Sequence, residues 1–170
     1  MKPNTTATNH RHGQYRRMWQ KDPGALQRVM ARIEPFTEPE QSQLTLPIRT
    51  AYERLRTGVG AAQDFHDLAG AINLTMVRCE AIDPMAEITA IDARDAMMRC
   101  WQRHLNTGKW GFDGPALQAL PPAIDLHEQL VRLSTPLQMA QAMQETIRRM
   151  TAGDVLQAIS TSTHTEAAAP

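Results

Sequence analysis

Apolar residues recur at intervals of three and four positions along most of the chain, and no segment alternates convincingly with the two-residue period of a strand. The chain therefore predicts helices and no sheet. The first helix is expected after Asp22-Pro23, because proline at the first helical position loses no internal hydrogen bond. Its apolar stripe consists of Leu26, Val29, Met30 and Ile33.

A second helix is predicted from a capping box, in which Thr37 precedes Glu40 by three residues. We expect this helix to end near Gly58. It should be kinked or split at Pro47, because proline removes one internal hydrogen bond. The apolar positions within it are Leu44, Ile48, Ala51, Tyr52 and Leu55.

Residues 61–82 form the most apolar of the predicted helices. One narrow stripe of this helix contains Ala61, Phe65, Leu68, Ile72, Met76 and Cys79. The opposite side carries Gly70, Leu74 and Val77. Because a helix that is apolar on both sides needs neighbours on both, we expect residues 61–82 to lie at the centre of the fold.

Two further helices follow. The pair Asp83-Pro84 predicts a helix that runs to about Asn106 and stops at Gly108. Asp113 begins the next helix, which the pair Pro121-Pro122 is expected to break or to restart. The buried stripe after this pair is predicted to contain Ala123, Leu126, Leu130 and Leu133.

The last long helix begins at Thr135-Pro136, and residues 154–159 are expected to add one more turn. Its apolar stripe consists of Met139, Met143, Ile147 and Met150. This periodicity favours a core stripe. Methionine-rich stripes also form adaptable binding surfaces, so the alternative is an exposed docking helix through which the chain forms a homodimer.

Together these elements predict an all-α, single-domain protein of about five to seven helices, arranged as an antiparallel bundle or an orthogonal array. We expect the helical domain to span residues 22–159. A flexible basic arm (residues 1–21) should precede it, and a disordered tail (residues 160–170) should follow it.

The composition of the 170 residues, 42% hydrophobic and 21% charged, is typical of a soluble domain. No apolar run reaches the roughly 18 residues of a membrane-spanning helix, and the polar N-terminus lacks the apolar core of a signal peptide. We therefore expect a cytoplasmic protein with no membrane partner. Cys79 and Cys100 are too few for a disulfide framework, and both lie in apolar stripes where burial keeps a thiol unreactive.

The formal net charge of zero hides a gradient, with a surplus of five positive charges in residues 1–57 and a deficit of five in residues 58–170. Near the N-terminus, cationic and aromatic side chains alternate in a way that suits phosphate contacts and base stacking. These side chains are Arg11, Tyr15, Arg16, Arg17, Trp19 and Lys21. They indicate an alternative function in nucleic-acid binding, although a pI of 7.0 is low for a dedicated nucleic-acid-binding domain.

Catalytic motifs are missing from the sequence, which has no nucleophile elbow, phosphate-binding loop or dinucleotide fingerprint. No second metal ligand follows His66, His104 or His127 at the helical spacing of a chelating pair.

We expect His104 to be a core histidine, and His66 and His127 to form surface hydrogen bonds. The carboxylates spaced three residues apart should be solvated: Asp92 with Asp95, and Asp125 with Glu128. We predict no cofactor and no enzymatic activity; a metal-dependent enzyme built on the three histidines is the further alternative.

Two of the eight aromatic residues, Trp110 and Phe112, lie in the loop between two predicted helices. Gly108 is expected to end one helix and Asp113 to begin the next, so both have a role as helix caps. The two aromatic residues have no such local role. They can fold inward and close the end of the helical domain. Alternatively, Trp110 stays partly exposed beside Lys109 and anchors a partner, since tryptophan is frequent at interface hot spots. The candidate partner-binding residues are therefore Lys109, Trp110 and Phe112.

The sequence thus favours a non-enzymatic helical module that binds another macromolecule, foremost another protein, as a regulator or inhibitor. A small helical chain without a catalytic motif is also typical of accessory proteins of bacterial plasmids and phages. Nucleic-acid binding through the basic N-terminal half is the alternative function.

Overall fold

A computed structural model of the chain describes residues 34–153, which form five helices and no strand. The helices are α3 (Glu38–Arg56), α4 (Ala62–Glu80), α5 (Pro84–Thr107), α6 (Gly114–Leu133) and α7 (Pro136–Ala152). The all-helical prediction is confirmed for this part of the chain. The predicted basic arm, the helix after Asp22, the turn at 154–159 and the tail lie outside the described residues. No helix within residues 34–153 is both long and apolar enough to cross a membrane.

Local hydrogen bonds place the helix ends close to the positions that the sequence predicts. At the start of α3, the Thr37 amide donates to the Glu40 carboxylate at 2.9 Å, as a capping box requires. The Asp83 carboxylate accepts the Met85 amide at 2.9 Å and begins α5. The same helix ends at Gly108, whose φ of +70° lies in the left-handed region that favours glycine.

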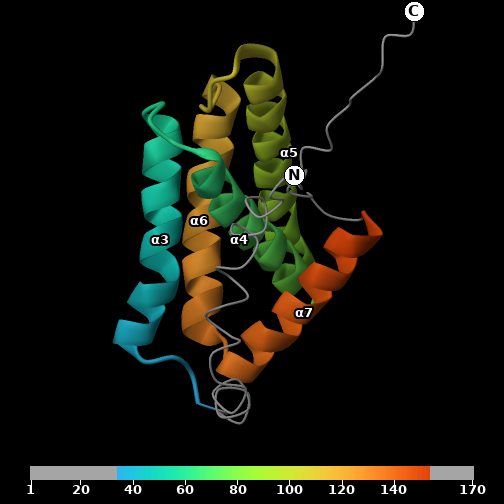
Figure 1. Cartoon of the computed structure of the whole chain (residues 1–170). Coiled ribbons are helices and arrows are strands. Elements are labelled where there is room, and N and C mark those ends of the chain that lie inside the picture. Colours follow the sequence, from blue (N-terminus) through green and yellow to red (C-terminus); the bar gives the residue numbers. More distant parts are fainter. Residues whose placement is uncertain (1–33, 154–170) are drawn as a thin grey trace, which may run out of the picture.

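Helix α4 lies at the centre of the described residues. Figure 1 shows α3, α5 and α6 standing around it, with α7 crossing at an angle. It packs against all four of the other helices. Every residue from Ala71 to Val77 is buried, and seven consecutive residues cover the whole circumference of a helix. The predicted central position of this helix is confirmed.

The main core lies where α4 meets α3, α5 and α6. Its largest fully buried side chains are Leu55 of α3, Phe65, Leu68 and Ile72 of α4, Met97 of α5, and Leu120 and Ile124 of α6. A second, smaller cluster joins Leu74 and Val77 of α4 to Ala142 of α7. Apolar contacts on two different sides of α4 therefore hold the helices together.

Helix α6 continues without a break through Pro121-Pro122. The expectation that this proline pair breaks or restarts the helix was therefore wrong. Since neither proline has an amide hydrogen, the Gln118 carbonyl lacks the donors that normally follow it by three and four residues. Gln118 is exposed, so water can reach this part of the helix. Leu120 and Ala123, on either side of the pair, are fully buried and hold α6 on the core. Pro47 likewise does not split α3.

Three apolar residues that we predicted to be buried are exposed. Leu133 is 77% exposed, Ile147 55% and Met143 41%. The buried residues of α7 are instead Pro136, Ala142 and Thr146. Met139 and Met150 of the predicted stripe are half-buried and pack against core clusters. The buried side of α7 is therefore shifted around the helix from the predicted stripe, toward Ala142 and Thr146. Small side chains such as Ala142 let two helices approach closely, which fits this side of α7 against α4.

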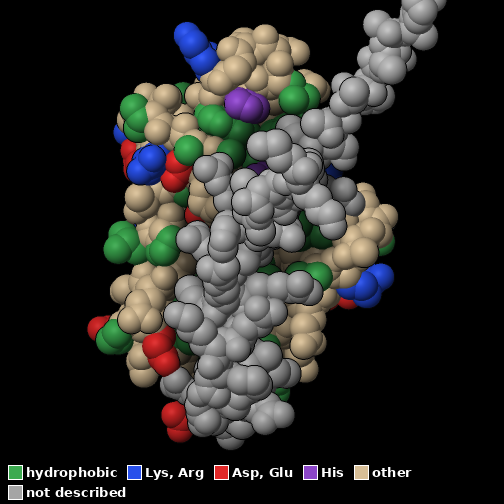
Figure 2. All heavy atoms as spheres, in the orientation of Figure 1, with side chains coloured by type: hydrophobic (Ala, Val, Ile, Leu, Met, Phe, Trp, Pro, Cys, Tyr) green, Lys and Arg blue, Asp and Glu red, His purple; other side chains and the backbone are tan. Residues whose placement is uncertain are grey.

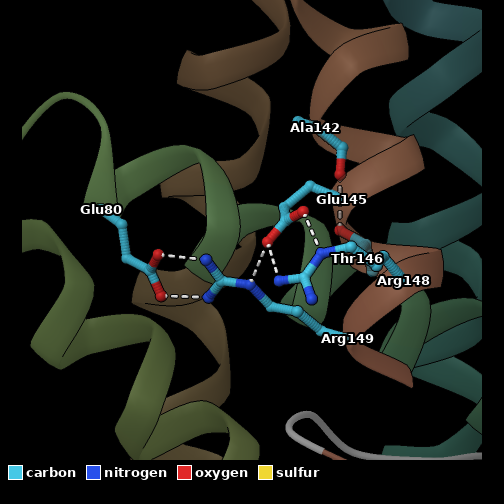
Figure 3. A network of polar contacts seen from close by, with 6 residues as sticks. All are labelled: Glu80, Ala142, Glu145, Thr146, Arg148 and Arg149. Carbon is cyan, nitrogen blue, oxygen red and sulfur yellow. Dashed lines mark hydrogen bonds and ion pairs between the residues drawn. The ribbon is translucent and has the colours of Figure 1, made fainter. Parts of the chain in front are cut away.

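An ion pair between Arg149 and Glu80 holds the C-terminal half of α7 to α4 (Figure 3). The guanidinium of Arg149 pairs with Glu80 of α4 and with Glu145 of its own helix. Its Nη2 donates to Glu80 at 2.6 Å, and its Nε donates to Glu145 at 2.8 Å. Hydrogen bonds from Arg148 and Arg149 lower the pKa of Glu145 to about 2, so this carboxylate stays charged at neutral pH. The network fixes the orientation of α7 on α4.

Leu130 and Leu133 belong to the same predicted stripe, but the structure gives them opposite environments. Leu130→Ala should lower the free energy of unfolding by about 2–4 kcal/mol, because Leu130 is buried and its truncation leaves a cavity. Leu133→Ala should change it by less than about 0.5 kcal/mol, because Leu133 is exposed. Urea denaturation of both variants measures the difference. Equal losses of stability would contradict the register of α6.

Candidate functional site

The loop between α5 and α6 carries the predicted partner-binding residues, and its C-terminal end is firmly anchored. The Asp113 carboxylate accepts the Ala116 amide at 2.7 Å and the Nε of Arg99 at 2.9 Å. Burial opposes the charged form of Asp113, but these two hydrogen bonds outweigh it and lower the pKa of its carboxyl. The ionised Asp113 therefore ties the loop to both neighbouring helices.

Trp110 is half-buried and lies against three other rings. Its ring is centred 3.8 Å from that of His104, with 7° between the two planes. The ring centroids of Phe65 and Trp101 lie 4.9 Å and 5.7 Å away. Aromatic rings packed in this way are fixed in orientation, because each ring restricts the rotation of the next. Trp110 is therefore held by α4 and α5 while part of its surface faces solvent.

Phe112 connects the same loop to α3. It stacks on Tyr52 with ring centroids 5.6 Å apart, and both rings pack against the main core. Burial raises the pKa of Tyr52. Inward packing, one of the two roles offered for these aromatic residues, thus holds for Phe112. Trp110 combines inward packing with partial exposure, so its proposed role as an anchor remains a prediction.

Two ring nitrogens in this cluster, Trp101 Nε1 and His104 Nδ1, are buried and have no hydrogen-bond partner within residues 34–153. The sequence predicts His104 to be a core histidine whose ring nitrogen is hydrogen-bonded. In the structure His104 is half-buried, and its ring lies on Trp110. Stacking therefore positions this imidazole within the described part of the chain.

We define the aromatic end by Val59, Leu105, Lys109, Trp110 and Phe112. Val59 follows α3, and Leu105 lies in the last turn of α5; both side chains are exposed, as is Lys109. Figure 1 places the loops after α3 and α5 at the same end of the molecule. Figure 2 shows a histidine side chain bordered by hydrophobic side chains at that end, with a projecting cation nearby. The surface here combines apolar groups with positive charge.

His127 is buried in the core, so the expectation of a surface histidine was wrong. The Thr75 hydroxyl donates to the Ala71 carbonyl at 2.8 Å, so its oxygen can accept the Nδ1–H of a neutral His127 at 3.0 Å. Burial lowers the pKa of His127 to about 4. This imidazole therefore stays neutral at physiological pH and joins α6 to α4.

The two carboxylate pairs occupy different surroundings. Asp125 and Glu128 both pair with Arg49 of α3; Asp125 is exposed, as expected, whereas Glu128 is half-buried. Asp92 and Asp95 line an open groove between α5 and α6. The other residues of this groove are Thr89, Arg99, Pro115, Gln118, Ala119 and Pro122.

The predicted burial of both cysteines is confirmed. Burial raises the pKa of Cys79 to about 11 and also raises that of Cys100, so both thiols are protonated at neutral pH. Among the side chains of residues 34–153, no group of three or more His, Cys, Asp or Glu is placed to hold a metal ion. The basic and aromatic residues near the N-terminus, from Arg11 to Lys21, lie outside the described part of the chain.

No protein-family model, curated protein or solved structure matches this chain. The aromatic end is therefore interpreted from its own geometry. The sequence identified Trp110 and Phe112 because they lack a local role in the loop. It did not identify Tyr52, Phe65 or His104 as their neighbours, because residues from distant helices meet only in the folded chain.

The packing of Trp110 predicts a measurable loss of stability on truncation. Trp110→Ala should lower the free energy of unfolding by about 2–4 kcal/mol, because three ring contacts are lost. Lys109→Ala, the neighbouring control, should change it by less than about 0.5 kcal/mol, since its side chain is exposed. Chemical denaturation measures both values. A Trp110→Ala variant as stable as the wild type would disprove the stacked arrangement.

The buried His127 predicts a loss of stability in acid. Its pKa is about 4 in the folded chain and roughly 6.5 when unfolded, so its contribution is complete above pH 6.5 and falls as the pH drops toward 4. The stability of the wild type relative to His127→Gln should therefore decrease by up to about 3 kcal/mol between pH 7 and pH 4. Denaturation midpoints over this range test the prediction. A constant difference between the two proteins would refute it.

Proposed function

We propose that this chain is a non-enzymatic protein-binding module and that its aromatic end contacts the partner. Trp110 is the central residue of this contact, with Lys109 and Phe112 beside it. The partial exposure of a rigidly stacked Trp110 is the observation that carries the proposal.

Rigidity matters because a side chain that is already ordered loses little conformational entropy when a partner binds. The contacts of Trp110 with His104 and Phe65 supply this order before binding. Tryptophan also offers a large apolar surface, and it is among the residues most frequent at interface hot spots. Partial exposure leaves some of this surface available to another protein.

Lys109 adds a positive charge next to the exposed part of Trp110. Charged residues at the rim of an interface increase the association rate and favour partners of opposite charge. The partner that fits this surface therefore presents an apolar pocket for the indole and a carboxylate for Lys109. Such binding is compatible with the regulator or inhibitor role inferred from the sequence.

The test compares the proteins that are retained from an extract of the source organism by the wild type and by three variants. Lys109→Glu reverses the charge of the exposed rim, and Trp110→Phe keeps an aromatic ring but removes part of the indole. Arg132→Glu is the matched control, because Arg132 is an exposed cation near the opposite end of α6. Quantitative mass spectrometry should identify a protein whose retention falls at least tenfold with the first two variants and is unchanged with the control.

Two results would overturn the proposal. One is a set of retained proteins that is the same for all variants. The other is retention of nucleic acid alone, in a salt-sensitive manner that disappears when Arg11, Arg16 and Arg17 are neutralised. That second result would support the alternative function in nucleic-acid binding.

A further inference from the structure

An apolar stripe on α7 that no other helix within residues 34–153 covers is the feature from which this inference starts. Met143 and Ile147 lie one turn apart on this helix, and both are exposed. The residues that α7 buries against α4 lie on another side, at Ala142 and Thr146. We call the surface formed by Met143 and Ile147 the α7 stripe. Isolated exposed apolar residues are common, but adjacent ones on a single helix face mark a surface that another element can cover.

The orientation of this stripe is fixed by the rest of the structure. Figure 3 shows Arg149 reaching from α7 to Glu80 of α4, with Glu145 beside it. On a helical projection, Glu145 and Arg149 lie on the side of α7 opposite Met143 and Ile147. Rotating α7 to bury the stripe against α4 would break the ion pair between Arg149 and Glu80. Any element that covers the stripe is therefore one other than α4.

The chain itself contains a segment of matching character. The sequence pattern predicts an amphipathic helix for residues 22–33, with Leu26, Val29, Met30 and Ile33 on one side. A helix of 12 residues is only marginally stable in water, so it needs a surface on which to bury its apolar side. Its expected length is about 18 Å, against about 25 Å for the 17 residues of α7.

The described chain begins directly after this segment, at a point near the first residues of α7. Glu34, the first described residue, directly follows Ile33. Figure 1 places this start at the lower end of the molecule, where α6 ends and α7 begins. A segment that reaches Glu34 from the far end of α7 runs antiparallel to α7. In that direction the first apolar residues of the segment, beginning with Leu26, lie toward Ile147 and the later ones toward Met143.

Net charge brings the N-terminal residues as a whole toward the described part of the chain. Residues 34–153 contain eleven Lys and Arg against fifteen Asp and Glu, whereas residues 1–33 contain seven Lys and Arg against a single Asp. The segment 22–33 itself has two arginines against one aspartate, and α7 has two arginines against one glutamate. The apolar match and the position of Glu34, not charge, therefore select α7.

We propose that residues 22–33 dock as an antiparallel amphipathic helix on the α7 stripe of the same chain. The segment buries its apolar residues against Met143 and Ile147. The aromatic end plays no part in this contact, so the inference is independent of the proposed function.

Cross-linking of the full chain tests the proposal. Leu26→Cys combined with Ile147→Cys should react with a short bismaleimide to give a linked monomer. The matched control combines Leu26→Cys with Leu46→Cys, because Leu46 is an exposed apolar residue on α3. The native Cys79 and Cys100 are buried and should remain unmodified. Mass spectrometry should show at least a tenfold higher yield of the intramolecular link for the first pair.

Equal yields for both pairs would overturn the proposal. A linked dimer as the main product would also overturn it and would assign the α7 stripe to a second copy of the chain.

Hydrogen exchange provides a second measurement that needs no cysteine. Leu26→Asp should accelerate the exchange of α7 amides about tenfold, whereas Gln27→Asp, on another side of the predicted helix, should not. Identical exchange in the two variants would exclude the docking.

Discussion

The burial of α4 on every side from Ala71 to Val77 is the constraint on which the rest of the structure depends. A helix enclosed on all sides requires neighbours around its whole circumference, and α3, α5, α6 and α7 supply them. Polar residues on such a helix must also find partners, because an unsatisfied buried group costs about 1–3 kcal/mol. Thr75 meets this requirement through the Ala71 carbonyl and His127. The position of α6 is therefore set by a polar contact as well as by apolar packing.

The continuity of α6 illustrates how packing outweighs local preference. A proline inside a helix costs about 3 kcal/mol relative to alanine, and α6 contains two of them. Burial of a large aliphatic side chain contributes about 1.5–3 kcal/mol, and several line the inner side of this helix. These residues are Leu120, Ile124, Leu130 and Val131. Apolar burial on both sides of the proline pair is thus large enough to keep one helix intact.

Two surfaces of the molecule expose apolar side chains in a fixed orientation: the aromatic end and the α7 stripe. The reasons for the exposure differ between them. At the aromatic end, Trp110 is inserted among the rings of other helices and exposes only part of itself. On α7, Met143 and Ile147 are exposed because an ion pair and small residues hold other sides of the helix against α4. The packing of Trp110 at the aromatic end contributes to the stability of the fold. Met143 and Ile147 stay exposed because the packing of α7 on α4 uses other sides of the helix.

The sequence by itself determined where each described helix begins and which of them is central, because caps and apolar periodicity act over a few neighbouring residues. The same local reasoning wrongly predicted a break at the proline pair of α6. It also singled out Trp110 and Phe112, which have no local role in their loop. Only the tertiary structure decided that α7 buries Thr146 rather than Ile147 and that His127 lies in the core. These outcomes depend on which helix lies opposite. A rotation of about 100° exchanges adjacent residues between core and solvent while leaving the local signals unchanged.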